Sequence, residues 1–272
     1  MKTRLRNALP APVLQAVRNG YDGLMRLPEL PAAYFHPWRR SSIRRLAALK
    51  DRHLGQRAFI LGNGPSLKHT DLSKLRGEVT FGLNRIYLMF PELGFPTSYL
   101  VSINDLVIEQ CAAELLQVPV PRFFAWRSRR HFESFTMDEK DLPIFLYTSY
   151  TGPRFARDAR GRLWEGATVT NVALQLAFHM GFSLVILIGI DHNFTSQGPA
   201  NTTVVSQGDD PNHFSPSYFG AGFRWQLPDL ETSERGYRLA RLAYEKAGRR
   251  IVDATIGGKL EVFEKVNYLD LF

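Results

Sequence analysis

The sequence predicts an α/β protein whose mostly parallel sheet is covered by helices on both faces, preceded by a basic helical extension. Three observations predict this class. From residue 58 onward, short apolar runs that fit buried strands alternate with longer amphipathic segments that fit helices. The first apolar run leads into the turn Gly62-Asn63-Gly64, as expected where a strand passes into a helix. The excess of positive charge lies before residue 58.

The charge distribution separates residues 1–57 from residues 58–272. The chain has 272 residues and a net charge of +8. Residues 1–57 hold 12 lysines and arginines against 3 acidic residues, whereas residues 58–272 hold 22 against 23. We therefore expect a basic extension at 1–57 followed by one large domain at 58–272.

The cysteine count and the apolar runs indicate the cellular compartment in which the protein functions. A single cysteine, Cys111, excludes an intramolecular disulfide and a cysteine-based zinc site, and it fits a reducing compartment. No apolar run approaches the roughly 18 residues of a transmembrane helix. The N-terminus lacks the apolar core and cleavage site of a signal peptide. These features predict a cytoplasmic protein.

The extension contains a candidate amphipathic helix. Val13, Val17, Tyr21 and Leu24 recur at helical spacing, with Arg18 among them. An apolar stripe with arginines suits the anionic inner face of a bacterial membrane, which would make the protein peripheral there. The alternative is a helix packed on the main domain with solvated arginines. Nucleic acid is not an expected partner, because no nucleic-acid-binding motif accompanies the charge.

The elements of residues 58–272 follow the alternation of apolar and amphipathic segments. The helix at 231–247 is best supported, because Tyr237, Leu242 and Tyr244 cluster on one side and charges lie elsewhere. Ligands of parallel sheets bind beyond the carboxyl ends of the strands, so the polar residues there are the site candidates. Strands are expected at 58–61, 79–83, 98–102, 122–125, 144–147, 184–188 and 250–253, and helices at 66–75, 106–116, 170–180 and 231–247.

The turn after the first strand is a candidate anion site. Gly62 and Gly64 let the backbone turn sharply and bring a ligand close to main-chain N–H groups. Pro65 suits the first position of a helix, and Ser66 offers a polar group beside it. A helix N-terminus in this place favours an anion. The sequence matches neither a P-loop nor the GxGxxG fingerprint, and an ordinary strand-to-helix turn is the alternative.

Asparagines and other polar residues follow several of the predicted strands. Asn63 follows the first strand, Asn84 the second and Asn104 the third, while Asp191 and His192 follow the strand at 184–188. If the sheet is parallel, these side chains meet at one edge. Amide groups both donate and accept hydrogen bonds, so together they suit a nucleobase, a ribose or a phosphate. Each asparagine alone is more often a turn residue.

Two further segments supply candidates. Thr168 and Thr170 open the helix predicted at 170–180, where they would either cap the helix or stand beside free N–H groups that favour an anion. Residues 192–228 form a long polar and aromatic loop that includes His213 and Tyr218. His213 is the best general-base candidate, although a lone histidine in a loop is by default a surface residue.

Four residues could instead hold a divalent metal, but they follow no recognised ligand spacing, so no metal is expected. They are Asp191, His192, Asp209 and Asp210.

The motifs together resemble the bacterial sialyltransferases of the Campylobacter type. The resemblance rests on Phe-Ile-Leu-Gly-Asn-Gly-Pro-Ser-Leu-Lys at 59–68, Phe-Gly-Leu-Asn-Arg at 81–85, the segment from Thr168 to Gly181-Phe182, Ile-Gly-Ile-Asp at 188–191 and a loop histidine. The same blocks are similar to a wider superfamily that includes the motility-associated flagellin glycosyltransferases and the archaeal 6-hydroxymethylpterin diphosphokinase. Asn-Gly-Pro-Ser-Leu does not distinguish sialyl transfer from pyrophosphoryl transfer.

The resemblance implies a Rossmann-like, GT-A-related fold and a nucleotide-binding, catalytic role for residues 58–272. It implies that Asn63 and Ser66 hold a CMP-sugar, together with Asn84 and Asn104. The donor-contacting turn falls at Thr168-Val169-Thr170, where the family's serine and glycine are replaced. The loop histidine that acts as the base matches His213, and the reaction inverts the anomeric centre without a metal.

The sequence departs from the sialyltransferase pattern at the residues that stabilise the leaving group. The sialyltransferases use two tyrosines just past the Gly-Ile-Asp strand to stabilise the departing phosphate. Here Asn193 stands at the first position, and no tyrosine follows until Tyr218. Leaving-group stabilisation would have to come from His192, Arg224 or Tyr218.

These inferences give one leading hypothesis and two alternatives. The leading hypothesis is a metal-independent inverting glycosyltransferase that carries a sialic, nonulosonic or related 2-keto sugar acid from CMP to a cell-surface glycan or glycolipid. The first alternative is a pyrophosphokinase-like enzyme that uses ATP, with Mg²⁺ on Asp191 and on Asp209 or Asp210. The second is a non-catalytic nucleotide-binding protein at the membrane. An oligomer is compatible with all three.

Overall fold

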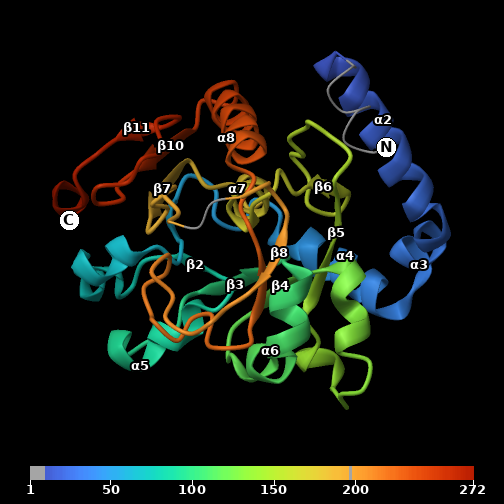
Figure 1. The fold of residues 1–272 in the computed structure, drawn as a ribbon, viewed down its shortest axis with the longest axis horizontal. Coiled ribbons are helices and arrows are strands. Elements are labelled where there is room, and N and C mark those ends of the chain that lie inside the picture. Colours follow the sequence, from blue (N-terminus) through green and yellow to red (C-terminus); the bar gives the residue numbers. More distant parts are fainter. Residues whose placement is uncertain (1–9, 196–197) are drawn as a thin grey trace.

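The computed structural model describes residues 10–195 and 198–272 and confirms the predicted α/β, Rossmann-like class (Figure 1). Over these residues the central sheet has nine strands, and every neighbouring pair runs parallel. The strands are β1 (Arg57–Leu61), β2 (Thr80–Leu83), β3 (Tyr99–Ser102), β4 (Arg122–Ala125), β5 (Ile144–Ser149), β6 (Arg162–Trp164), β7 (Leu184–Ile188), β10 (Arg250–Asp253) and β11 (Glu264–Lys265), in the spatial order β11-β10-β7-β1-β2-β3-β4-β5-β6. The apolar runs predict all of them except β6 and β11, which are too short to give a run of their own.

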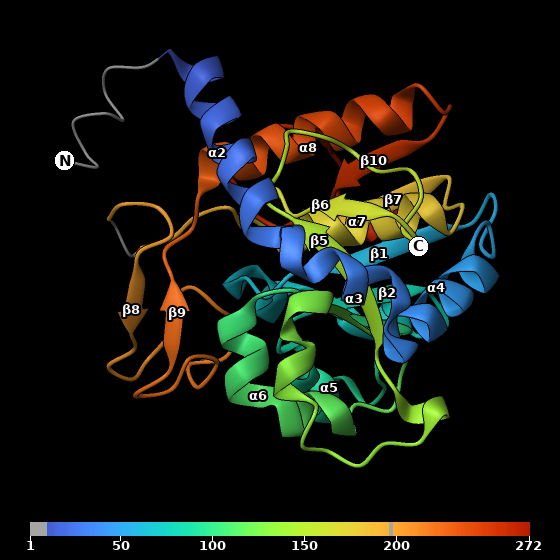
Figure 2. The same ribbon diagram turned by 90° about the vertical axis from the view of Figure 1, so that its right-hand side faces the viewer.

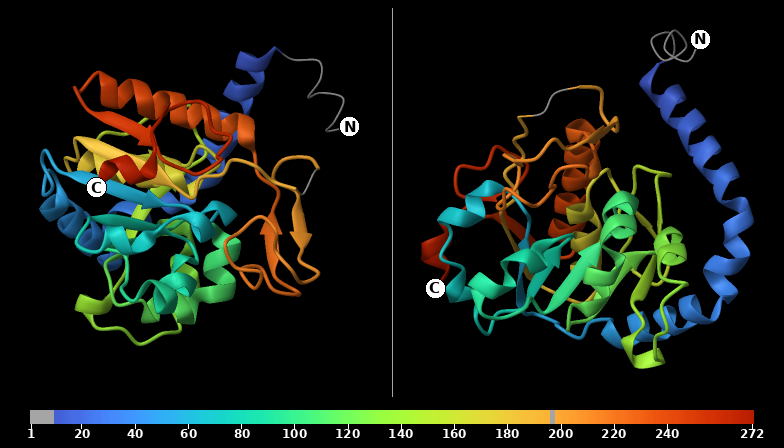
Figure 3. Two further views of the ribbon diagram at one scale, coloured as in Figure 1. Left: turned by 90° about the vertical axis from the view of Figure 1, so that its left-hand side faces the viewer. Right: turned by 60° about the horizontal axis from the view of Figure 1, so that its bottom comes forward.

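Helices cover both faces of the sheet, as predicted. The helix α6 (Asp105–Gln117) lies on one face, and α7 (Val169–His179) and α8 (Leu230–Glu245) lie on the other (Figures 1 and 3). Successive residues of β1 alternate between the two cores: Ala58 and Ile60 pack on the side of α7, and Phe59 and Leu61 on the side of α6. Strands buried on both faces read as continuous apolar runs, which is why the sequence reveals them.

The strand order places a topological switch point beside β1. The strands β2 to β6 extend from one side of β1, whereas β7 and β10 lie on its other side. The loops that follow β1 and β7 therefore leave the sheet in different directions, and a crevice opens beyond their carboxyl ends.

The helix predicted at 66–75 is wrong in type. The structure has two separate 3₁₀ turns there, Pro65–His69 and Leu72–Leu75. Thr70 between them is extended, and the Asp71 carboxylate accepts a hydrogen bond from the Ser73 amide, which starts the second turn. Side chains of this kind compete with the helical backbone for hydrogen bonds and favour caps over helix interiors. Other short elements are α5 (Phe90–Leu93) and the 3₁₀ turns Ile86–Met89, Trp126–His131, Glu139–Asp141 and Tyr268–Leu271.

The segment 192–228 contains regular structure that the sequence does not reveal. The strands β8 (Thr203–Val205) and β9 (Arg224–Gln226) pair antiparallel and stand apart from the main sheet (Figure 2). Three residues per strand are too few to give an alternating pattern.

The N-terminal extension follows one side of the sheet (Figures 2 and 3). It consists of α2 (Ala11–Arg26), a 3₁₀ turn (Leu27–Glu29), α3 (Leu30–Phe35) and α4 (Pro37–Leu49). Arg39 of α4 is fully buried and donates to the carbonyl oxygens of Phe145 and Arg160, and Leu46 joins the core beneath α7. The helix α4 thus packs on the main domain, as the alternative prediction has it. The helix α2, in contrast, exposes Val17, Tyr21 and other apolar side chains. Within residues 10–195 and 198–272, none of the helices has the length and the apolar composition that a membrane span requires.

Candidate functional site

A cavity of about 160 Å³ opens at the switch point. Five segments enclose it: the loops after β1 and β7, the starts of α7 and α8, and the part of the long loop around His213. Because strands in a parallel sheet end at the same edge, residues far apart in sequence meet here. The predicted site residues that line the cavity are Gly62, Asn63, Gly64, Thr168, Thr170, Asp191, His192 and His213, and other lining residues include Asn193, Phe194, Asn212, Ser233 and Tyr237.

The two glycines of the first loop are required by packing. A Cβ atom on Gly62 would overlap the Gly189 carbonyl oxygen, and one on Gly64 would overlap the Asp191 carboxylate. Their amides are also already bonded, Gly62 N–H to the Ile188 oxygen (2.8 Å) and Gly64 N–H to the Gly189 oxygen (3.0 Å). This corrects the expectation that these two amides face a ligand: the glycines let the loops after β1 and β7 lie against each other.

Asp191 fastens the same two loops together. Its carboxylate accepts hydrogen bonds from the Ser66 amide (3.1 Å) and the Ser66 hydroxyl (2.7 Å). Ser66 is buried in this contact and does not line the cavity. The first loop is also tied to the long loop, because the Phe214 amide donates to the Asn63 carbonyl oxygen (2.8 Å). These contacts fix the position of the Asn63 side chain at the cavity wall.

Asn63 presents an unsatisfied acceptor. Its Oδ1 atom is buried, and no donor within residues 10–195 or 198–272 reaches it. A buried acceptor without a partner costs about 1–3 kcal/mol. A ligand that donates a hydroxyl or amino hydrogen at this wall would recover that energy, so this atom independently indicates a binding site.

The start of α7 supplies the helix N-terminus that the first loop lacks. Thr168 caps the helix, since its Oγ1 accepts from the Thr170 amide (3.2 Å). Gly166 and Ala167 before it both have left-handed backbone, with φ of +55° and +57°. Alanine is unfavourable in that conformation, so the fold holds this turn against a local preference. Residues 167–170 line the cavity, and the partial positive charge of an 11-residue helix therefore faces it.

His213 is held by a carboxylate. Its Nδ1 atom lies 2.7 Å from Asp210 Oδ2, and its ring stacks on Tyr218 with centroids 3.9 Å apart and planes 7° apart. Asp210 is buried and accepts a second hydrogen bond from the Asn212 amide (3.0 Å). An ionised carboxylate only accepts hydrogen bonds, so the imidazole donates through Nδ1, and Nε2 is left as the acceptor.

His192 forms a second carboxylate–imidazole pair on the same cavity. Its Nε2 atom lies 3.2 Å from Glu234 Oε1 of α8, and its ring meets Tyr237 edge to face. Glu234 also pairs with Arg238 (2.6 Å). The backbone of His192 is left-handed, with φ of +52°, which is uncommon outside glycine and turns the side chain toward α8. Two imidazoles, each held by a carboxylate, thus reach one cavity from the loop after β7 and from the long loop.

A comparison with protein-family models decides the family. Residues 38–197, more than half of the chain, match the model described as 6-hydroxymethylpterin diphosphokinase MptE-like. The chain belongs to the MptE-like family. The match confirms the superfamily suggested by the sequence motifs and covers β1 to β7, whereas His213, α8 and β10 lie beyond it.

Two further comparisons complete the picture of this MptE-like chain. The solved structure of the MAf glycosyltransferase from Magnetospirillum magneticum AMB-1 is similar over 86% of this chain at 16% identity, with a TM-score of 0.48. The chain spans 39% of that longer protein. The comparison with curated proteins finds no match.

Besides Ser66, three predicted residues lie outside the cavity of the MptE-like chain. Asn84 Oδ1 accepts from the Ser102 hydroxyl (3.0 Å), and Asn104 Oδ1 caps α6 by accepting from the amides of Leu106 and Val107. Both follow strands at the same edge of the sheet, but each is used in a local contact. Tyr218 is fully buried beneath His213, and its hydroxyl accepts from the Arg85 amide.

The carboxylates needed for a magnesium site do not converge. Asp191 is bound to Ser66, Asp210 is bound to His213, and Asp209 lines a different hollow beside β8. No group of three or more histidines, cysteines or acidic residues with metal-binding geometry occurs in the described part of the chain. We therefore derive no step through a metal.

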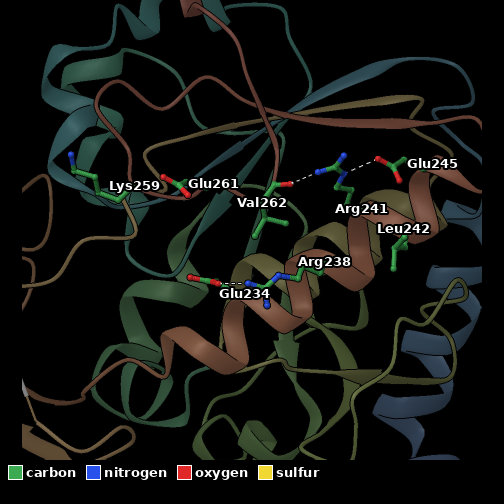
Figure 4. Close-up of a pocket in the computed structure, with 8 residues that line it drawn as sticks. All are labelled: Glu234, Arg238, Arg241, Leu242, Glu245, Lys259, Glu261 and Val262. Carbon is green, nitrogen blue, oxygen red and sulfur yellow. Dashed lines mark hydrogen bonds and ion pairs between the residues drawn. The ribbon is translucent and has the colours of Figure 1, made fainter.

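A larger hollow of about 590 Å³ lies on the far side of α8 (Figure 4). Its charged side chains largely neutralise one another: Arg238 pairs with Glu234, and Arg241 with Glu245. It has no helix N-terminus or unsatisfied buried acceptor of the kind found at Asn63. Glu234 is the residue that connects it to the candidate site.

The sequence reasoning missed the partners of the two histidines. Asp210 stands three residues before His213, and this spacing is a signal that was visible in the sequence. Glu234, Ser233 and Tyr237 lie on α8, and nothing in the sequence connects them to the loop after β7. Their role follows from the packing of α8 over the switch point.

Proposed function

We propose that the protein is a transferase that uses a nucleotide-activated donor, and specifically a metal-independent inverting glycosyltransferase with a CMP-activated 2-keto sugar acid such as a sialic or nonulosonic acid. The proposal rests on one observation: four features line the same cavity. They are two imidazoles, each held by a carboxylate, the N-terminus of a helix, and the Asn63 side-chain oxygen, which has no hydrogen-bond donor. Together they offer a base, an anion site and a hydrogen-bond acceptor for the nucleotide.

His213 has the arrangement of a general base. Asp210 fixes the tautomer in which Nε2 carries a lone pair, and the stacked Tyr218 fixes the plane of the ring. In the proposed step, Nε2 takes the proton of an acceptor hydroxyl while that oxygen forms the new bond to the anomeric carbon. The bond from the anomeric carbon to the CMP phosphate oxygen breaks, and its electron pair leaves with CMP.

His192 is the residue best placed to stabilise the leaving phosphate. The other candidates lie elsewhere: Arg224 stands on β9 in an ion pair with Glu109 (3.0 Å), and Tyr218 is buried beneath His213. Glu234 Oε1 holds the imidazole of His192 at Nε2 (3.2 Å), and in the proposed step Nδ1–H of the imidazolium donates to a phosphate oxygen. The start of α7 adds N–H groups and dipole charge in the same cavity.

The cavity is smaller than the roughly 300 Å³ of common small-molecule pockets. Its enclosed volume of about 160 Å³ suits the phosphate and adjoining groups, so we expect the remainder of the nucleotide at its mouth. A ribose hydroxyl or the cytosine amino group would satisfy Asn63 Oδ1. We propose the acceptor to be a glycan or glycolipid and the place of action to be the cytoplasmic face of a membrane, because α2 exposes an apolar stripe beside the body.

The family match favours a second candidate, a diphosphokinase-like transfer from ATP. In this reaction His213 would deprotonate the acceptor hydroxyl before its attack on a phosphoryl group. The scattered carboxylates argue against it, because such transfers rely on magnesium held by protein oxygens and substrate phosphates.

Calorimetry and turnover assays test the proposal. We expect CMP to bind in the presence of EDTA, with an affinity about 10- to 100-fold lower in Asn63→Ala because one buried hydrogen bond is lost. His213→Ala should retain binding and lose turnover. Binding of ATP with Mg²⁺ but not of CMP would support the diphosphokinase. Nucleotide binding by the wild type without any product would leave only the non-catalytic alternative, and full turnover by His213→Ala would show that His213 is not the base.

A further inference from the structure

A groove of about 440 Å³ runs between the N-terminal extension and the β5–β6 edge of the sheet. Figures 2 and 3 show α2 passing along this edge, away from the switch point. The groove is walled mainly by apolar groups, namely Gly20, Gly23, Leu24, Leu27, Leu30 and Tyr147. Its outer wall, α2, is held in place by Asn19, which bonds to both the amide and the oxygen of Gly152, and by Asp22, which accepts from the Thr151 hydroxyl.

Two arginines without a partner lie at or near this groove, Arg162 at the start of β6 and Arg154 in the loop before it. Arg162 lines it, and Arg154 lies close enough that both burial and the charge of Arg162 lower the pKa of Arg154. Neither guanidinium forms an ion pair or a hydrogen bond with any described residue. Two like charges held together without a counter-ion are unfavourable for the folded protein, and an anion between them would remove that cost.

Three arginines of the extension are already held by groups of the protein itself. Arg26 is bound to Asp22 (2.7 Å) and to the Thr148 oxygen (2.8 Å), Arg39 is buried, and Arg45 donates to the Leu142 oxygen. Their charges hold the extension on the body. The unpaired positive charge at the groove is therefore that of Arg162, with Arg154 nearby.

The exposed apolar stripe of α2 leads into the groove. Val17, Tyr21 and Leu24 are 57%, 66% and 65% exposed, and Leu24 also lines the groove. Contiguous apolar side chains on a surface, bordered by unpaired cations, match the two layers of an anionic lipid leaflet: acyl chains for the stripe and phosphates for the arginines.

We propose that this groove is a binding site for an anionic phospholipid, with the phosphate between Arg154 and Arg162 and the acyl region against Leu24, Leu27 and Tyr147. It goes beyond the proposed transfer reaction, because the site lies at the β5–β6 edge of the sheet, away from the switch point between β1 and β7, and uses none of the residues around the catalytic cavity. The occupant is a lipid rather than free phosphate because the charged pair opens onto apolar walls.

Flotation of the full-length protein on vesicles tests the site. Vesicles of phosphatidylcholine with 30% phosphatidylglycerol should carry the protein, and vesicles of phosphatidylcholine alone should not. Arg154→Gln/Arg162→Gln should weaken partitioning about 30-fold, the effect of two basic residues at an anionic surface. The matched control is Lys246→Gln/Arg250→Gln, which removes the same charge from exposed positions near the other edge of the sheet and should float like the wild type.

A second pair of variants tests the contribution of the apolar groove wall to vesicle binding. Leu24→Ser should reduce flotation several-fold, whereas Leu242→Ser, at a 50% exposed position on α8, should not. Equal losses in both charge variants, or no flotation at all, would contradict the proposal. Binding of soluble polyglutamate without flotation would assign the groove to an acidic protein instead, and binding of inorganic phosphate that Leu24→Ser leaves unchanged while flotation is absent would assign it to a free anion.

Discussion

Asp210 Oδ2 lies 2.7 Å from His213 Nδ1, three residues further along the same loop. This contact leaves Nε2 of the histidine as the acceptor on the wall of the cavity. The imidazole is stacked on Tyr218, which is itself buried, so neither its tautomer nor its plane is free to change. The proposed chemistry depends on this pair.

Replacing Asp210 by asparagine should therefore impair turnover and spare binding. An amide at this position can donate to Nδ1 and thereby stabilise the wrong tautomer. We expect kcat to fall roughly 100- to 10,000-fold. Nucleotide affinity, measured by calorimetry, should change less than threefold. A loss of affinity as large as the loss of kcat would mean that Asp210 supports the fold of the loop.

His192 and Glu234 should act on the leaving group. Removing a donor to a developing negative charge typically costs roughly 100- to 1,000-fold in kcat, so this loss is expected for His192→Ala. Glu234→Gln keeps the hydrogen bond but not the charge, and about a tenfold loss is expected. Donors with a better leaving group should recover part of the rate in both variants. If poor and good leaving groups respond alike, His192 has another role.

The loops after β1 and β7 should not tolerate a side chain at Gly64. A methyl group there would meet the Asp191 carboxylate, so Gly64→Ala should destabilise the protein by about 3 kcal/mol and lower the Tm by several degrees. Gly161→Ala is the matched control, because an added methyl group would make only an ordinary contact 3.7 Å from the Asp158 oxygen. Thermal melting followed by circular dichroism measures both. A Gly64→Ala protein as stable as the control would show that these loops are not packed as described.

Asp158 gives a pH-dependent prediction. Its hydrogen bonds from Arg160 lower the pKa of the carboxyl to about 2, below the ordinary value of about 3.9. A carboxyl with a lowered pKa stabilises the folded state above its unfolded pKa, and this contribution is lost as the pH falls from about 4 to 2. The pair is partly exposed, so we expect less than about 1 kcal/mol. The Tm difference between the wild type and Asp158→Asn should be present at pH 6 and vanish near pH 2, and a difference that does not depend on pH would contradict the assignment.

The sequence predicts the strands of this fold better than its site. Buried parallel strands such as β1 and β7 are continuous apolar runs, so local sequence is enough to find them. The helix expected at 66–75 failed because Asp71 restarts the turn through its side chain, a choice between two hydrogen-bonding patterns that apolar periodicity does not report. Position 64 must be glycine because the Asp191 carboxylate packs against it. Asp191 lies 127 positions further along the chain, so the sequence around Gly64 does not reveal this requirement.

The candidate site also combines features that the local sequence reveals with features that depend on contacts between distant residues. The edge of the sheet was predicted from the rule that ligands of parallel sheets bind beyond the carboxyl ends of the strands, and His213 was predicted from the ionisable groups in the long loop. Asn84 and Asn104 were expected at the ligand because they follow neighbouring strands, yet each makes a local hydrogen bond instead. Glu234 was absent from the prediction because its link to His192 spans 42 residues and depends on how α8 crosses the switch point.

A crystal structure of the protein with CMP would show whether the nucleotide binds at the switch point. We expect CMP there, with its phosphate at the start of α7 and a donor of the nucleotide within about 3.2 Å of Asn63 Oδ1, as is usual for a hydrogen bond. His213 Nε2 should face the open side where an acceptor would enter. CMP bound in the hollow beyond α8, or absent from the cavity at saturating concentration, would contradict the proposal.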